Sequence, residues 1–236
     1  MRSFDPKPGV GVLGSDESPA MIRRFQRSEL PADTVELARW LIGKVLVHEH
    51  AEGRVAGRIV ETEAYPVGDA ASHAFRRQTP RNRAMFLERG HAYVYLAYGV
   101  SCLLNVSSEG PGIGAAVLLR ALEPLDGIAE MQARRGTARV RDLARGPGRL
   151  TQTMGVDLSF DGLDLCHGPL WLGAPAGGNE VRGTCGIGGT CEARGACEAR
   201  DIGRSVRIGI TKDADRLLRF YELGNSFVSG PKRLNL

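Results

Sequence analysis

Strand-forming segments come in clusters along this chain, and this arrangement restricts the possible folds more than any other feature. Apolar and β-branched residues dominate residues 44–48, 54–62, 91–97 and 114–122, with shorter runs at Arg207–Ile210 and Arg219–Tyr221. Helices are predicted at residues 32–42, between Pro124 and Gly136, and at Leu143–Thr153. Because the strands follow one another rather than alternating with helices, we expect an α+β fold whose mostly antiparallel, curved sheet is flanked by helices.

The chain has 236 residues, enough for one large domain or two small ones, and no linker clearly divides it. We therefore expect a single domain over residues 21–236, preceded by a disordered tail at residues 1–20 that is rich in Pro, Gly, Ser and Asp. No window reaches the roughly 18 apolar residues of a membrane span, and the N-terminus lacks the apolar core of a signal peptide. These features predict a cytoplasmic protein without membrane contact.

A glycine-rich segment at about residues 183–200 repeats three times with a period of six, and each copy carries one cysteine: Cys185, Cys191 and Cys197. The equal spacing matches no common zinc pattern, and no histidine lies nearby in the sequence. The five cysteines of the chain are an odd number, which argues against a complete disulfide framework. We interpret the segment as an insertion, with a metal or redox site as the alternative.

Two carboxylates lie two positions apart on a predicted strand. Strand alternation would place Glu61 and Glu63 on one face together with Ile59 and Tyr65. A carboxylate on a mostly buried strand is costly unless it has a partner or a task. Paired carboxylates can divide acid and base roles; the alternative is that salt bridges or solvent satisfy them.

Aromatic and basic residues gather close to these carboxylates. Tyr93 and Tyr95 share a strand face, Tyr98 follows at a turn, and His73 precedes a run of arginines. Stacked rings beside positive charge suit a nucleobase, although ordinary packing explains any single tyrosine. The arginines, which suit phosphate contacts or a solvated surface, are Arg76, Arg77, Arg81 and Arg83, with six more from Arg134 to Arg149. Neither a metal-ligand pattern nor a nucleotide-binding glycine motif is present, so no metal or cofactor is expected.

Five ordered strings resemble the alkyladenine (3-methyladenine) DNA glycosylase family. They are Arg58-Ile-Val-Glu-Thr-Glu-Ala-Tyr65, Gln78-Thr-Pro-Arg-Asn-Arg83, Tyr93-Val-Tyr95 with Tyr98-Gly99, Leu118-Leu-Arg-Ala-Leu-Glu-Pro124, and Gly146-Pro147 followed by Leu150. The resemblance extends from Phe25 to Gly173 and resumes from Arg207 to Ser229, so the cysteine repeat departs from the family. It implies a fold similar to the formyltransferase C-terminal domain.

The resemblance also implies an activity in base-excision repair. Such an enzyme hydrolyses the bond between an alkylated or deaminated purine and its deoxyribose in double-stranded DNA, and leaves an abasic site. A stacked base is out of reach, so the nucleotide is flipped out of the duplex. By resemblance, Tyr98 is the wedge that fills the vacated space, and Asn105 disfavours the amino group of normal guanine. The expected base pocket comprises Tyr65, His73, Tyr95, Asn105, Leu118 and Ile208.

The resemblance assigns the chemistry to Glu63, as the base that deprotonates a water held by Arg120 and the backbone carbonyl of Ile208. DNA-backbone contacts are expected from Arg76, Arg77, Arg81, Arg83 and Arg149. No lysine is expected at the pocket positions to form a Schiff base, which predicts a monofunctional glycosylase. The enzyme is also expected to be a monomer.

Two alternatives stay open. A module that recognises nucleic acid without catalysis would need Glu63 or Arg120 to be replaced, and both are present. The other is an RNA-binding role, since similar folds contact transfer RNA. A preference for DNA or for RNA would distinguish this role from the DNA glycosylase.

Overall fold

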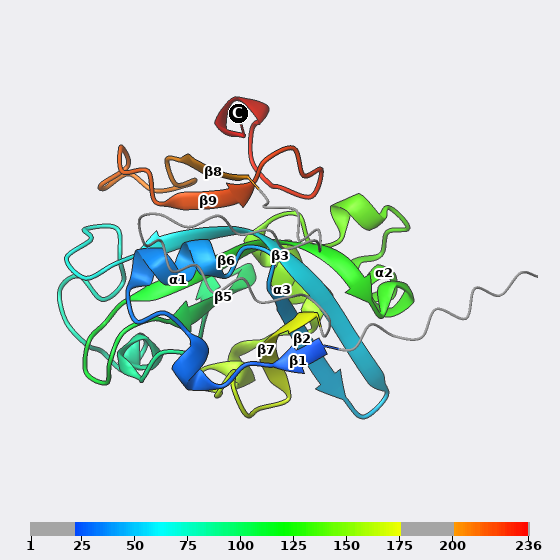
Figure 1. Ribbon diagram of the computed structural model, residues 1–236, viewed down its shortest axis with the longest axis horizontal. Helices are drawn as coiled ribbons and strands as arrows, with labels where there is room; N and C mark the ends of the chain where they lie inside the picture. The colour runs from blue at the N-terminus through cyan, green and yellow to red at the C-terminus, as the bar shows by residue number, and fades with distance from the viewer. Residues whose placement is uncertain (1–21, 176–200, 236) are drawn as a thin grey trace, which may run out of the picture.

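The computed structural model describes residues 22–175 and 201–235, which form one curved nine-stranded sheet with three α-helices (Figure 1). Every strand pair in this part of the chain is antiparallel. The predicted α+β class is therefore confirmed. The predicted N-terminal tail and the cysteine repeat lie outside the described residues.

The sheet follows the order β1-β7-β2-β3-β6-β5-β4, and β8 and β9 join it through β3. The strands are β1 (Ile22–Arg24), β2 (Val45–His50), β3 (Gly53–Tyr65), β4 (Ala92–Ala97), β5 (Ser101–Ser107), β6 (Ala116–Asp126), β7 (Leu170–Pro175), β8 (Ile202–Ser205) and β9 (Arg219–Glu222).

The long strand β3 organises the sheet, and Figure 1 shows it crossing the whole molecule. Its first half pairs with β2 through residues 53–58, and residues 61–63 pair with β9. The other edge of β3 pairs with β6. Glu61 and Glu63 are consequently flanked by β6 on one side and β9 on the other.

Three helices are present in the described residues: α1 (Thr34–Trp40), α2 (Ile128–Arg135) and α3 (Pro147–Met154). The carboxylate of Asp33 caps α1 by accepting hydrogen bonds from the amides of Val35 and Glu36. Leu37 of α1 and Leu150 of α3 are fully buried in one apolar core shared with the sheet. None of these helices is long and apolar enough to cross a membrane.

The structure corrects several boundaries. The strand predicted at Arg207–Ile210 is wrong: β8 ends at Ser205 and the chain then leaves the sheet. The reason is tertiary, since the Arg207 side chain pairs with Asp69 and the Ile208 amide donates to a side chain instead of a strand. The helix predicted from Leu143 begins at Pro147, which occupies its first turn. Four strands, β1, β5, β7 and β8, escaped prediction.

Candidate active site

A β-bulge in β3 creates the face on which the candidate site lies. The pairing of β3 with β6 shifts register between Ile59 and Thr62. Ile59 and Ala64 pack in the main core, and the Thr62 hydroxyl donates to the carbonyl of Ala38 in α1. Ile59 therefore does not share a face with the glutamates, which point to the opposite side and contact Arg120.

Residues of five strands form a row across this face. Direct pairing joins Tyr93 to Asn105, Asn105 to Leu118, Leu118 to Glu63, and Glu63 to Arg219. Side chains opposite one another on neighbouring antiparallel strands lie within contact range. The antiparallel register thus brings segments more than 150 residues apart in the sequence to one site.

Glu61 is enclosed by cations. Its Oε1 accepts hydrogen bonds from Nε of Arg120 at 2.8 Å and Nε of Arg219 at 2.7 Å, and its Oε2 accepts from the Ser229 amide at 2.7 Å. Burial raises the pKa of Glu61, but the charges of Arg120 and Arg219 outweigh burial and the net pKa lies below its usual value. Both oxygens of this carboxylate are therefore occupied by hydrogen bonds to structural partners.

Glu63 has a different environment, although it is also buried. Its Oε1 accepts the Ile208 amide at 2.7 Å and lies 3.2 Å from Nη1 of Arg120. Its Oε2 accepts the hydroxyl of Tyr65 at 2.9 Å, and this is its one hydrogen bond among the residues that the structure describes. Burial, followed by the charge of Glu63, raises the pKa of Tyr65, so this phenol stays protonated and donates. The Oε2 atom of Glu63, next to the Tyr65 hydroxyl, therefore retains a lone pair that can accept a further hydrogen bond.

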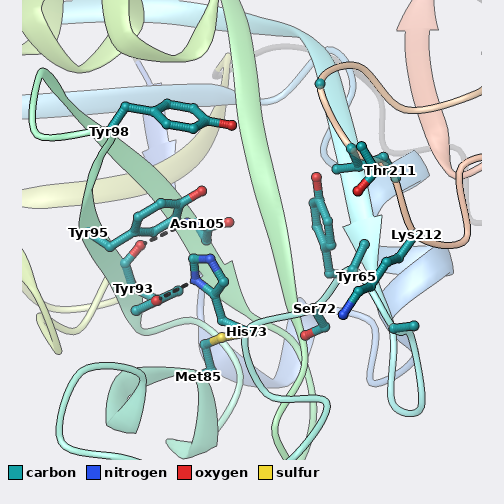
Figure 2. A pocket seen from close by; sticks show the side chains of 14 residues that line it. Tyr65, Ser72, His73, Met85, Tyr93, Tyr95, Tyr98, Asn105, Thr211 and Lys212 are labelled. Carbon is teal, nitrogen blue, oxygen red and sulfur yellow. Dashed lines mark hydrogen bonds between the residues drawn. The ribbon is translucent and has the colours of Figure 1, made fainter.

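Tyr65, which donates to this carboxylate, lines a cavity of about 460 Å³. Figure 2 shows Tyr98, Tyr95 and His73 along one side of it, and Tyr65, Thr211 and Lys212 along the other. The residues that line it are Tyr65, Ala70, Ala71, Ser72, His73, Met85, Tyr93, Tyr95, Tyr98, Asn105, Gly209, Ile210, Thr211 and Lys212. Its aromatic walls and mouth suit a flat ring.

The aromatic side is held by ring contacts and hydrogen bonds. Tyr93 and Tyr95 stack with centroids 5.4 Å apart, and His73 meets Tyr95 edge-on at 4.6 Å. Nδ1 of His73 lies 2.8 Å from the Tyr93 hydroxyl, and Nδ2 of the Asn105 side chain donates to the Tyr93 carbonyl. Desolvation and then the charge of Arg81 lower the pKa of His73, so a neutral ring predominates at pH 7.

Tyr98 stands at the tip of the β4–β5 hairpin and is 95% exposed. Tyr98 and Gly99 have φ of 51° and 70°, and the Val100 amide donates to the Ala97 carbonyl. Two central residues with positive φ are typical of a type I′ hairpin turn. The turn holds a large aromatic side chain out into solvent at the edge of the cavity.

The predicted DNA-backbone arginines all have exposed side chains; they are Arg76, Arg77, Arg81, Arg83 and Arg149. Arg81 and Arg83 line a second cavity of about 440 Å³, separated from the first by the shared residue Tyr95. Arg149 lies on α3, with its guanidinium 4.0 Å from the Asp142 carboxylate.

Five of the predicted pocket and wedge residues line the cavity: Tyr65, His73, Tyr95, Tyr98 and Asn105. Leu118 and Ile208 do not line it, and neither do the predicted catalytic residues Glu63 and Arg120, which lie behind Tyr65. Their roles stay predictions.

One residue of the cavity wall was not assigned from the sequence. None of the predicted pocket positions is a lysine, but Lys212 also lines the cavity. It lies on the loop before β9, outside every string that carries the resemblance, so no local pattern signals it. Arg219 was missed for a similar reason: its strand was predicted, but its contact with Glu61 depends on β9 pairing with β3. In the described residues no cluster of three or more His, Cys, Asp or Glu could hold a metal ion.

Comparisons with known proteins identify the family of this chain. The methylpurine-DNA glycosylase family model matches residues 28–226. A protein of Mesorhizobium japonicum is 60% identical over 222 residues, covering 94% of this chain and 95% of the relative. Proteins of Paraburkholderia phytofirmans and Methanoculleus marisnigri are 52% and 46% identical, covering 88% and 84% of this chain and 89% and 94% of their own lengths. All three carry the name "Putative 3-methyladenine DNA glycosylase". The chain therefore belongs to the methylpurine-DNA glycosylase family of DNA glycosylases.

Proposed function

We propose that this glycosylase flips an alkylated or deaminated purine nucleotide out of double-stranded DNA and hydrolyses its N-glycosidic bond with an activated water, leaving an abasic site. The observation that carries the proposal is the hydrogen bond between the Tyr65 hydroxyl, on the pocket wall, and the Glu63 carboxylate behind it. It couples a surface suited to a flat base to the group best able to act on water.

The base would lie between Tyr65 on one side and His73 with Tyr95 on the other. Stacking on aromatic side chains contributes about 1–3 kcal/mol per base, enough to offset the few kcal/mol that unstacking costs. The raised pKa of Tyr93, caused by burial, keeps its phenol protonated. Tyr93 can then donate to Nδ1 of His73, which leaves Nε2–H as a donor for the edge of the base.

Glu63 would act as the general base, with Arg120 and the Ile208 carbonyl holding the water. The Ile208 amide and Arg120 fix the position of its Oε1, and a fixed anion can also stabilise the positive charge that develops on the sugar. Alkylation makes the purine cationic and weakly bound, so departure needs little acid assistance. Glu61 is the poorer candidate, because two arginines and an amide occupy its oxygens.

Replacing Glu63 with glutamine tests this assignment while preserving side-chain volume. In duplexes with one hypoxanthine or ethenoadenine, Glu63→Gln should lower the single-turnover rate of base release by about 10²–10⁴-fold, the usual contribution of a general base, and still bind the lesion duplex. Glu49→Gln on β2, whose partly exposed carboxylate lies 3.6 Å from Arg24, is the control and should keep the wild-type rate. Undiminished release by Glu63→Gln would remove the catalytic assignment.

Lys212 requires a separate test of the monofunctional route. Reaction in borohydride should trap no covalent protein–DNA adduct, and alkali should be needed to cleave the abasic strand. An adduct lost in Lys212→Met would instead identify a lyase acting through an imine. The same assay on matched RNA and DNA substrates separates the glycosylase from an RNA-binding role. We further propose that the enzyme acts as a monomer, in the cytoplasm, on the DNA it repairs.

A further inference from the structure

Two loops that line the pocket are joined by a buried ion pair. One loop follows β3 and contributes Ala70–His73; the other precedes β9 and contributes Gly209–Lys212. Asp69 in the first and Arg207 in the second meet with Oδ2 and Nη1 2.8 Å apart, and both side chains have no exposed surface.

Two further contacts join the loops, and others brace each loop internally. Nη1 of Arg216, in the second loop, also donates to Oδ2 of Asp69, at 3.1 Å. Nη2 of Arg207 donates to the Asp213 carbonyl at 3.2 Å, and the Asp213 carboxylate accepts the Ala70 amide at 2.8 Å. Oδ1 of Asp69 accepts the amide of Ala71 in its own loop, also at 2.8 Å. Asp213 adopts a φ of 45°, a conformation that costs a non-glycine residue about 1 kcal/mol or more. The two walls are therefore fixed against each other.

Arg207 also supports the ring of Tyr65. Its guanidinium carbon lies 4.6 Å from the Tyr65 ring centroid, and Nη1 donates to the Ala64 carbonyl at 3.0 Å. Tyr65 in turn donates to Glu63, and the residue after Arg207 donates its amide to the same carboxylate. One side chain thus connects the base-stacking ring, the carboxylate and both loops.

We propose that Arg207, paired with Asp69, is a positioning residue for base release: it fixes the Tyr65 ring and the separation of the two pocket walls without touching the substrate. This inference rests on the proposed function of the same pocket. A buried ion pair is weak evidence for added stability, because desolvation offsets its attraction. The Nε of Arg207 also finds no hydrogen-bond partner in the described residues. We therefore assign this pair to holding the Tyr65 ring and the two loops in position rather than to stabilising the fold.

The test uses the full-length protein with Arg207→Lys, which keeps a charge opposite Asp69 but loses the planar group over Tyr65. Single-turnover release from an ethenoadenine duplex should fall by at least ~10-fold, as expected when a reacting group is misplaced by a fraction of an ångström. The Kd for that duplex should stay within ~3-fold and the melting temperature close to wild type, which separates positioning from folding. Arg54→Lys, in the Arg54–Asp126 pair that lines neither cavity, is the matched control and should retain the wild-type rate.

Three outcomes would overturn the proposal: an unchanged rate in Arg207→Lys, an equal fall in Arg54→Lys, or a fall explained by lost folded protein. A second measurement does not depend on catalysis. In the free protein, Asp69→Asn should accelerate amide hydrogen exchange in residues 70–73 and 208–212 together; acceleration in only one segment, or in neither, contradicts the coupling. Base release absent from the wild type would refute the proposed function instead, and the exchange result would still decide whether the pair couples the loops.

Discussion

At the scale of single residues, two glutamates two positions apart have different hydrogen-bond partners. Glu61 is bound on both oxygens by Arg120, Arg219 and the Ser229 amide. One oxygen of Glu63, by contrast, has Tyr65 as its single partner within residues 22–175 and 201–235. The sequence could not separate them from their spacing, and only the resemblance favoured Glu63. The distinction comes from β9, which brings Arg219 next to β3.

Removing the Glu61 charge should destabilise the fold rather than only the chemistry. Glu61→Gln leaves Arg219 buried without a counter-charge, which typically costs about 3–5 kcal/mol. Because the pKa of Glu61 in the folded protein lies below its ordinary 4.5, its stabilisation is present above that pH and is lost as the pH falls through the lower folded-state pKa.

Urea unfolding of wild type and Glu61→Gln at pH 7 and at progressively lower pH would measure this difference. The gap in unfolding free energy should be largest at pH 7 and shrink below pH 4.5. Glu123→Gln, whose partner Arg58 also contacts Glu222, is the control at a more exposed pair and should cost about 0–1 kcal/mol. A gap that does not change with pH would contradict the assigned linkage.

At the scale of elements, the β4–β5 hairpin holds an exposed tyrosine in a strained conformation. A tyrosine at positive φ costs roughly 1–2 kcal/mol relative to a residue that accepts the left-handed region, and its side chain gains little burial in return. A costly, solvent-exposed aromatic residue at the mouth of a pocket is better explained by contact with DNA than by folding.

Asparagine tolerates the left-handed region, so Tyr98→Asn separates strain from function. The variant should unfold at the same or a higher temperature than wild type, yet bind a lesion duplex more weakly by about 1–3 kcal/mol, the value of a lost stacking contact. Thermal melting and fluorescence anisotropy measure the two effects. Leu125→Ala, a half-exposed apolar residue that lines neither cavity, should leave affinity unchanged; a parallel loss there would argue against a specific wedge.

At the scale of the whole molecule, strands β2, β3, β4, β6 and β9 were predictable from the sequence, whereas β1, β5, β7, β8 and the loops were not. Tyr93 and Tyr95 reach the pocket because they alternate along the predicted strand β4, whereas Asn105 reaches it from β5, which pairs with β4 across a three-residue loop at residues 98–100. Lys212 and Asp69 lie on loops whose course depends on a buried ion pair between distant segments. Side-chain pairing of that kind leaves no periodic signal in the sequence, and it also removed Arg207 from its predicted strand.

The charge distribution of the whole molecule leads to a last prediction. The net charge is only +4, so steep salt dependence must come from local contacts by exposed arginines. Each phosphate contact contributes about 0.9 to the slope of log K against log salt. Arg76→Ala and Arg77→Ala should therefore each reduce the slope by about 1 and weaken binding to lesion and undamaged duplexes equally. Arg39→Ala, on the exposed side of α1, is the control and should leave the slope unchanged. Binding titrations from low to moderate salt measure this slope. A slope that neither substitution changes would mean that the DNA backbone contacts another surface of the protein.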